Sequence, residues 1–393
     1  MRRFPALLCL LLAAPALQAD TYLVLPLFNL SGEPSLNWVG ESVAEEFQEA
    51  LASEGLLVVE RDDRHNLFRR LALRPYTALT RASVARLGEV ADADSVIFGE
   101  FEVTPGPENT LAKSTIRIRC WRLDLKQIRR SPELNELGAL EDLASLQSHL
   151  VWQGLQHILQ PAPTEEEFRR RRRVVRIDAI ESYIRGLLAP ADQKLRLFTQ
   201  AARLDPGYPR PAFRLGQLLV GNKEYRAAIE WLTKIPASDP HYREALFLLG
   251  LARYRTNDFK GAAESFKTVA ADVPLNEVIN NYGSALSRLN DPQAGEALEQ
   301  ALTGDEADPA YHFNVGYWLW KQGNYNNAAD RFRAVLDRTP DDADATTLLG
   351  RCLKQSGPRK GDPRSEGLER LKESYHEGAW RQLKAMLERG DKK

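Results

Sequence analysis

Residues that usually carry redox or metal chemistry are scarce in this 393-residue chain. It has three cysteines, two methionines and six histidines. The histidines lack metalloprotease spacing, and no cysteine cluster suggests a zinc site. A phosphate-binding Walker loop, a full dinucleotide-binding glycine pattern and a nucleophile elbow are also missing from the sequence. We therefore predict no enzymatic activity, no metal and no cofactor.

The chain also lacks an excess of positive or negative charge. The chain has 53 Lys and Arg against 54 Asp and Glu, which gives a formal net charge of −1. A balanced chain has no strong bias toward nucleic acid or an anionic membrane, so no nucleic-acid partner is expected. The apolar content of 43% is ordinary for a globular protein, and the length indicates two or three domains.

No apolar run reaches membrane-spanning length, but a shorter one lies near the beginning. Arg2 and Arg3 precede an apolar stretch over 4–17, and Ala19 offers a small residue for cleavage. Residues 1–19 are therefore predicted to be a signal peptide that directs the protein to the periplasm. The alternative is an uncleaved N-terminal segment that anchors the protein in the envelope, and peripheral envelope association is a further option.

Two cysteines, Cys120 and Cys352, would remain after cleavage. An oxidising compartment permits a disulfide between them. Because they fall in different predicted domains, two separate buried thiols are the favoured prediction.

The most informative feature is an internal repeat in the second half of the chain. Glycines recur at intervals of 33 or 34 residues, at Gly216, Gly250, Gly283, Gly316 and Gly350. Prolines recur in phase with them, at Pro206, Pro240, Pro274, Pro309 and Pro340. A glycine suits a point where two helices cross closely, and a proline ends a helix and begins the next turn.

This pattern resembles the tetratricopeptide repeat over about 178–390. The resemblance implies an all-α solenoid, predicted over 178–393, with about six helical hairpins and a curved concave face. The sixth hairpin has a long insert at 357–367 before its second helix. Residues 379–387 place Ala379, Trp380, Leu383 and Leu387 on one helical face, which predicts a C-terminal cap helix over the open end of the stack.

In this family the first helix of each hairpin lines the concave groove. The residues predicted to line it are Phe213, Phe247, Tyr254, Arg255, Asn280, Asn281, Arg288, Phe313, Asn314, Tyr317, Trp320, Lys321, Arg351 and Lys354. Aromatic rings supply contact area, amides can bond a peptide backbone, and cations can bind carboxylates. The alternative is that some of the aromatic residues only pack between neighbouring repeats.

Residues 20–160 show a different pattern. Apolar and alternating runs predict strands at 22–28, 56–60, 95–103 and 111–125. Helical stripes predict helices from Leu36 to Leu51, at 80–90 and at 137–159. This order predicts an α+β domain, with helices packed on a mixed sheet, ahead of the all-α solenoid.

The segment from Pro26 to Pro34, followed by Trp38-Val39-Gly40, resembles the opening of TolB N-terminal-like domains. Val96 to Gly99 resembles a later strand of the same domains, which are related to CsgG and to FlgO-type proteins. The resemblance covers roughly 21–125 and implies envelope assembly, secretion or partner docking. The chain lacks an obvious pore-forming hairpin, which argues against a channel.

Asn29 to Gly32 follows a strand end, where small anionic ligands or nucleotides often bind. The same residue types are ordinary turn formers, so both interpretations stay open, with the turn favoured. A charged helical linker is predicted at 161–177, where Thr164 and Glu167 form a capping box. The arginines at 169–173 are expected to pair with nearby glutamates, and binding of anionic lipid or of an acidic partner is the alternative.

Together these features predict an exported envelope scaffold that binds a partner protein or peptide in the concave groove, with the N-terminal domain docking a second partner. The main alternative is an oligomeric subunit of an envelope assembly or secretion system that acts through the N-terminal domain. An enzyme or ligand sensor that uses the Asn29–Gly32 loop is the third hypothesis. The sequence does not name the partner, the pathway or the oligomeric state.

Overall fold

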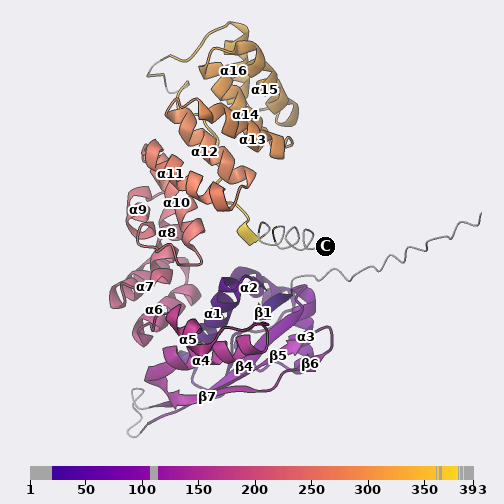
Figure 1. Ribbon diagram of the computed structural model, residues 1–393, viewed down its shortest axis with the longest axis vertical. Helices are drawn as coiled ribbons and strands as arrows, with labels where there is room; N and C mark the ends of the chain where they lie inside the picture. Colours follow the sequence, from indigo (N-terminus) through magenta and orange to yellow (C-terminus); the bar gives the residue numbers. More distant parts are fainter. Residues whose placement is uncertain are drawn as a thin grey trace, which may run out of the picture.

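A sheet domain is followed by a long stack of helices in the computed structural model (Figure 1), which describes residues 20–106, 114–359, 361–362, 365–378, 380 and 384. The predicted fold class, an α+β domain before an all-α solenoid, is confirmed. The predicted signal peptide lies outside the described residues. Within these ranges, no helix has both the length and the apolar character that a membrane crossing requires.

A seven-stranded mixed sheet forms the centre of the N-terminal domain. The strands are β1 (Thr21–Val24), β2 (Phe28–Asn29), β3 (Leu57–Val58), β4 (Ser95–Thr104), β5 (Thr115–Asp124), β6 (Arg129–Arg130) and β7 (Leu134–Ala139). The main path runs β3-β1-β4-β5-β6, with β2 joined to β4 and β7 joined to β5. The first part of the sheet is parallel, and β4 and β5 form a long antiparallel pair from Ser95–Asp124 to Thr104–Thr115.

Side chains of β1 alternate between two apolar layers, one on each face of the sheet. Tyr22 and Val24 join the layer under α1 and α4, whereas Leu23 and Leu25 join the layer under α2 and α3. The elements on the sheet are η1 (Pro34–Leu36), α1 (Asn37–Ser53), α2 (Arg61–Arg70), α3 (Arg81–Val90), η4 (Leu140–Asp142) and α4 (Leu143–Gln156). Helices therefore cover both faces.

Two helices of the sheet domain differ from the sequence prediction. The helix expected at 137–159 begins only at Leu143, because residues up to Ala139 form β7, where Leu137 pairs with Arg117 and is exposed. Helix α2 was not predicted. Its sequence is rich in charge and has few apolar positions, so it carries little helical stripe, and it buries Arg64 beside Leu67 and Phe68.

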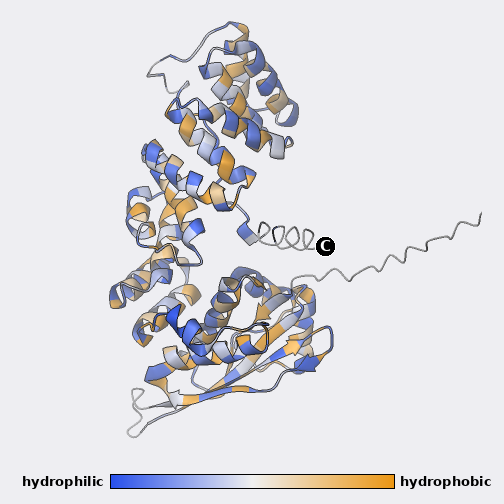
Figure 2. Ribbon diagram, viewed as in Figure 1, coloured by the Kyte–Doolittle hydropathy of each residue, from blue (hydrophilic) through white to orange (hydrophobic). Residues whose placement is uncertain are grey.

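Antiparallel helical hairpins make up the second half of the chain. They are α6 (Ile177–Leu188) with α7 (Ala191–Leu204), α8 (Pro209–Gly221) with α9 (Tyr225–Leu232), α10 (Tyr242–Arg255) with α11 (Phe259–Asp272), α12 (Asn276–Arg288) with α13 (Gln293–Gly304), and α14 (Pro309–Lys321) with α15 (Tyr325–Arg338). Helix α16 (Ala343–Leu353) packs on α15. Apolar and polar residues alternate around these helices, as amphipathic packing requires (Figure 2).

The repeated glycines mark close helix crossings, as the sequence indicates. A Cβ atom at Gly250 would lie 2.8 Å from the Phe266 ring of the paired helix. At Gly350, in α16, an added Cβ atom would meet nothing within 4 Å. This difference arises because the described residues include no following helix that pairs with α16 as α11 pairs with α10.

The predicted linker bridges the two parts of the molecule. Helix α5 (Glu165–Arg170) begins with the expected capping box of Thr164 and Glu167. Each of the arginines at 169–173 pairs with a carboxylate of the same chain, the partners being Glu165, Glu166, Glu54, Glu46 and Asp205. The structure therefore favours internal pairing over lipid binding for this segment.

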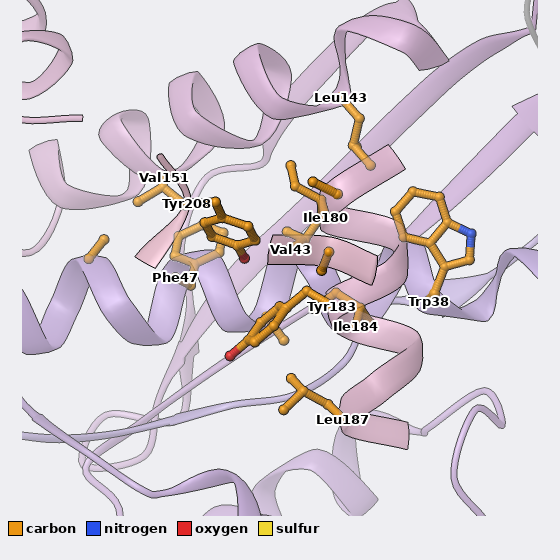
Figure 3. Close-up of a cluster of buried hydrophobic side chains, with 14 of the residues drawn as sticks. Trp38, Val43, Phe47, Leu143, Val151, Ile180, Tyr183, Ile184, Leu187 and Tyr208 are labelled. Carbon is orange, nitrogen blue, oxygen red and sulfur yellow. The ribbon is translucent and has the colours of Figure 1, made fainter. Parts of the chain in front are cut away.

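One apolar core runs across the boundary between the sheet domain and the stack (Figure 3). Trp38, Val43 and Phe47 of α1 face Ile180 and other apolar residues of α6, and Tyr208 enters the same cluster from the loop before α8. Arg210 of α8 reinforces this contact by pairing with Glu46 at 3.0 Å. The two parts are thus packed as one unit, which the sequence pattern did not predict.

Candidate functional site

The concave groove of the stack holds a segment of the same chain. After α16 the described residues form no helix until 377, and residues 365–378, here called the tail segment, run back from α14 toward α10. The side chain of Trp380 donates to the Asp272 carbonyl of α11 at 3.1 Å. Trp380 therefore lies beside the middle of the stack. Ala379, Leu383 and Leu387, which were predicted to share its helical face, lie outside the described residues, so the cap helix stays a prediction.

Asparagine side chains hold the backbone of the tail segment. The Asn314 amide donates to the Arg370 carbonyl at 2.8 Å and accepts from the Arg370 N–H at 2.7 Å. Asn281 makes the same two bonds with Lys372, at 2.8 and 2.7 Å. Arg370 and Lys372 are two residues apart, which is the spacing at which a strand offers its backbone groups to one neighbour. The groove therefore binds this backbone much as a neighbouring strand would.

The side chain of Glu369 enters a polar pocket between α10, α12 and α14. Its carboxylate accepts from the Tyr254 hydroxyl at 3.1 Å and from the Ser287 hydroxyl at 2.9 Å. Lys321 Nζ lies 3.6 Å from this carboxylate and Arg288 lies 3.9 Å from it. The Glu369 side chain is 1% exposed, so its charge is compensated inside the protein.

The environment of this pocket shifts the ionisation of its members. Burial lowers the pKa of Lys321, and the neighbouring Glu369 carboxylate opposes that shift. Burial also raises the pKa of the Tyr254 phenol, and the Glu369 carboxylate adds to the increase. The phenol therefore stays protonated at neutral pH and donates to the carboxylate.

Two basic side chains of the tail segment meet acidic and aromatic partners. The Arg370 guanidinium forms a two-pronged pair with Asp342, at 2.6 and 2.9 Å, and lies 3.6 Å from the centre of the Phe313 ring. Lys372 pairs with Asp308 and lies 4.8 Å from the centre of the Tyr311 ring. Charge pairing and cation–π contact thus act together at both positions.

Further predicted groove residues contact the tail segment or the loop before it. Tyr375 packs on Phe247 with ring centroids 4.8 Å apart. The remaining pairs are Asn280 with the Arg370 carbonyl, Arg255 with Glu373, Tyr317 with the Ser365 carbonyl, Trp320 with the Ser356 carbonyl, and Arg351 with Asp362. Most of the predicted groove residues therefore lie against the tail segment or the loop before it, which belong to the same chain.

Two predicted residues lie elsewhere. Phe213 stacks on His241, with ring centroids 4.6 Å apart, and lines a cleft of about 1390 Å³ between the sheet domain and the stack. Lys354 is exposed at the C-terminal end of α16. Both were assigned from their repeat register, which does not show where the concave face meets the sheet domain.

The sequence analysis missed the acidic and hydroxyl partners in the groove. Ser287, Asp308 and Asp342 all bind the tail segment, and Asp308 and Asp342 are also the N-cap residues of α14 and α16. An aspartate at an N-cap is explained by that position alone, so neither aspartate stands out in the sequence as a groove residue. The one available signal was the glycine- and proline-rich stretch that interrupts the sixth hairpin.

The Asn29–Gly32 loop forms a turn whose polar groups bond within the protein. The Asn29 amide donates to the Glu33 carbonyl at 2.8 Å, and its oxygen accepts from the Ser31 N–H at 2.9 Å. The Ser31 hydroxyl accepts from the Val103 N–H at 2.7 Å, and Gly32 has a φ of 73°. These contacts favour the turn interpretation.

Cys120 and Cys352 are separate, buried thiols, as expected. Burial raises the pKa of Cys120 well above the usual range and that of Cys352 to about 11, so both are poor nucleophiles at neutral pH. Among the described residues, no group of three or more His, Cys, Asp or Glu side chains could hold a metal ion.

Comparison with known proteins supports the repeat assignment. One family model described as tetratricopeptide repeat matches residues 192–254, and another of the same description matches 237–277 and 316–357. Neither reaches residues 21–125, where the resemblance to TolB N-terminal-like domains stays a prediction.

Two curated relatives each match about two fifths of the chain. The human cell division cycle protein 16 homolog is 25% identical over 165 residues, which are 40% of this chain and 22% of that protein. Anaphase-promoting complex subunit 6 of Arabidopsis thaliana is 26% identical over 169 residues, 41% of this chain and 31% of that protein. The chain thus spans less than a third of the length of these relatives.

Solved structures that match part of this chain include MamA from Desulfovibrio magneticus RS-1, at 20% identity and a TM-score of 0.38, covering 42% of this chain and 98% of that one. YrrB, described as a TPR protein with an unusual peptide-binding site, has 20% identity and a TM-score of 0.35, covering 50% and 98%. The family models match residues 192–277 and 316–357, and the structure has helical hairpins there. We conclude that these residues are tetratricopeptide repeats.

Proposed function

We propose that this protein is a tetratricopeptide-type scaffold that binds an extended segment of a partner protein in its concave groove. The observation that carries the proposal is the pair of asparagines that bond both polar groups of alternate backbone residues, at Arg370 and Lys372. Backbone bonds of this kind suit any extended peptide, because they do not depend on the bound side chains.

The sheet domain provides a second surface, which is packed against the beginning of the helical stack. Its α1 helix shares an apolar core with α6, so a partner on the sheet domain and a partner in the groove would be held in a defined relative position. We propose that this arrangement serves as an adaptor in the bacterial envelope. N-terminal sequencing of the exported protein tests the location, and the expected first residue is Asp20.

The groove is tested with the full chain, because a fragment that begins near residue 178 would expose the face of α6 that packs on α1. The substitution Glu369→Lys places a third cation beside Lys321 and Arg288 and should loosen the tail segment. An array of extended peptides is then probed with this chain.

Peptide binding is expected to fall at least about tenfold when Asn314→Ala is added, since two charge-independent backbone bonds are lost. Asn326→Ala, on the exposed side of α15, is the matched control and should leave binding unchanged. If no peptide bound in a manner that depended on Asn314, the proposed function would be wrong.

A further inference from the structure

The tail segment occupies the groove through contacts that are mostly polar and charged. The apolar core of the stack is built from the helices themselves, and the tail residues Leu368, Leu371 and Tyr375 pack against it while half-buried. The described tail therefore does not complete the core of the stack. Its charged contacts resemble those of an exchangeable ligand more than those of a structural cap.

Side-chain recognition in the groove is concentrated over four successive residues. Glu369 is enclosed by Tyr254, Ser287, Arg288 and Lys321, here called the glutamate subsite. The next side chain, Arg370, is held by Asp342 and Phe313. Two residues later Lys372 meets Asp308 and Tyr311.

The signs of these contacts define what can replace the tail. The glutamate subsite presents two cations and two hydroxyl donors, so it favours a carboxylate and repels a basic side chain. The positions of Arg370 and Lys372 are lined by aspartates and aromatic rings, so they favour cations. Glu373, by contrast, is 65% exposed and pairs at 2.7 Å only with Arg255 among the described contacts.

We infer that the groove selects partner segments in which an acidic residue that fills the glutamate subsite is followed by basic residues one and three positions later, and that the chain's own Glu369, Arg370 and Lys372 occupy these subsites until such a partner displaces them. This inference rests on the proposed peptide-binding function. A tethered ligand has an effective concentration of about a millimolar, so the tail suppresses the binding of weaker ligands without preventing the entry of a strong one.

The experiment measures the binding of a labelled peptide, with the sequence of residues 365–376, to the full chain by fluorescence anisotropy. The Glu369→Lys chain should bind this peptide at least about tenfold more tightly than the unmodified chain, because the tethered competitor is weakened while the glutamate subsite stays intact. Glu373→Lys in the chain makes the same change of charge at an exposed tail residue, and should leave peptide affinity within about threefold of the unmodified chain.

The same two changes are then made in the peptide. Glu369→Lys in the peptide should weaken binding to the Glu369→Lys chain at least about tenfold, whereas Glu373→Lys should change it less than about threefold. Equal effects of both changes would overturn the glutamate subsite. Equal affinity of the unmodified and Glu369→Lys chains for the original peptide would overturn displacement of the tail.

Hydrogen exchange of residues 366–376 reports directly on the tail. Protection should be lost in the Glu369→Lys chain and kept in the Glu373→Lys chain, and protection kept in both would overturn the inference. Failure of the proposed function looks different, because then no peptide of any sequence would bind in an Asn314-dependent manner. Asn314-dependent binding that ignores the acidic residue would overturn only the specificity inferred here.

Discussion

Buried polar side chains in the sheet domain and in the helical stack have different kinds of partner. In the sheet domain, Arg64 of α2 is 2% exposed, pairs with Glu41 of α1 and donates to the Val24 carbonyl at 3.0 Å. All three belong to one packed unit. In the stack, Asn281 and Asn314 are as deeply buried, but their backbone partners lie in a tail segment that follows the last described hairpin helix.

This difference separates structural polar contacts from exchangeable ones. Removing Arg64 from the sheet domain leaves the buried Glu41 carboxylate with Arg61, at 2.9 Å, as its remaining close cation and removes a donor to the Val24 carbonyl, which destabilises the fold. Removing the tail segment opens the asparagines to water, which can replace the lost bonds. Burial alone therefore does not distinguish the two regions, whereas the identity of the covering segment does.

The largest expected effect is on the sheet domain. Replacing Arg64 with Leu leaves Glu41 with less compensation and should lower the free energy of unfolding by about 3–5 kcal/mol. Chemical denaturation followed by circular dichroism measures this change. Arg86→Ala, which removes an exposed pair with Glu89, is the control and should have little effect. A small effect at Arg64 would mean that the sheet domain also tolerates loss of its buried partners.

The next effect concerns helix packing within the stack. Gly250→Ala brings a methyl group to 2.8 Å from the Phe266 ring and should lower the free energy of unfolding by about 1–3 kcal/mol. Gly350→Ala is the matched control, because it adds the same group at the same repeat position with nothing within 4 Å. That change should be neutral or stabilise by up to about 1 kcal/mol. Equal destabilisation by the two substitutions would contradict the difference in packing between Gly250 and Gly350.

The smallest effect is a weakening of tail docking at low pH. The hydrogen bond from Arg370 holds the pKa of Asp342 below its usual value, so the ionised form is favoured while the tail is docked. The Asp342–Arg370 pair therefore stabilises the docked tail fully above about pH 4, the ordinary range of the aspartate pKa. This stabilisation is lost as the pH falls through the lowered pKa of Asp342. Asp342→Asn should remove this part of the pH dependence.

A dye at the exposed tail position Ser374→Cys reports on docking through its anisotropy. Labelling is expected to be selective, since burial shields Cys120 and Cys352 and raises the pKa of Cys352 to about 11. Anisotropy should stay constant from about pH 7 to about pH 4 and then decrease. The same decrease in the Asp342→Asn chain would assign the pH response to other groups.

The repeats and the mixed sheet domain could be predicted from the sequence because both depend on short-range patterns. Glycines spaced by 33 or 34 residues report on helix crossings within each hairpin, and alternating residues such as Leu23 and Val24 report on the two faces of a strand. Most of the residues assigned to the groove from their repeat register lie against the tail segment or the loop before it. Helix α2 escaped detection because its charged sequence has almost no apolar stripe.

Only the tertiary structure decided what the groove contains and how the two parts of the chain are joined. The tail segment is extended and has no helical periodicity, and its partners lie far away in sequence, as Arg370 does from Asn314, 56 residues earlier. The core shared by α1 and α6 likewise forms between apolar faces that the sequence assigns to separate domains. Local patterns determine which helices form, whereas contacts between distant segments arise only when the packed helices create a surface of complementary shape and charge.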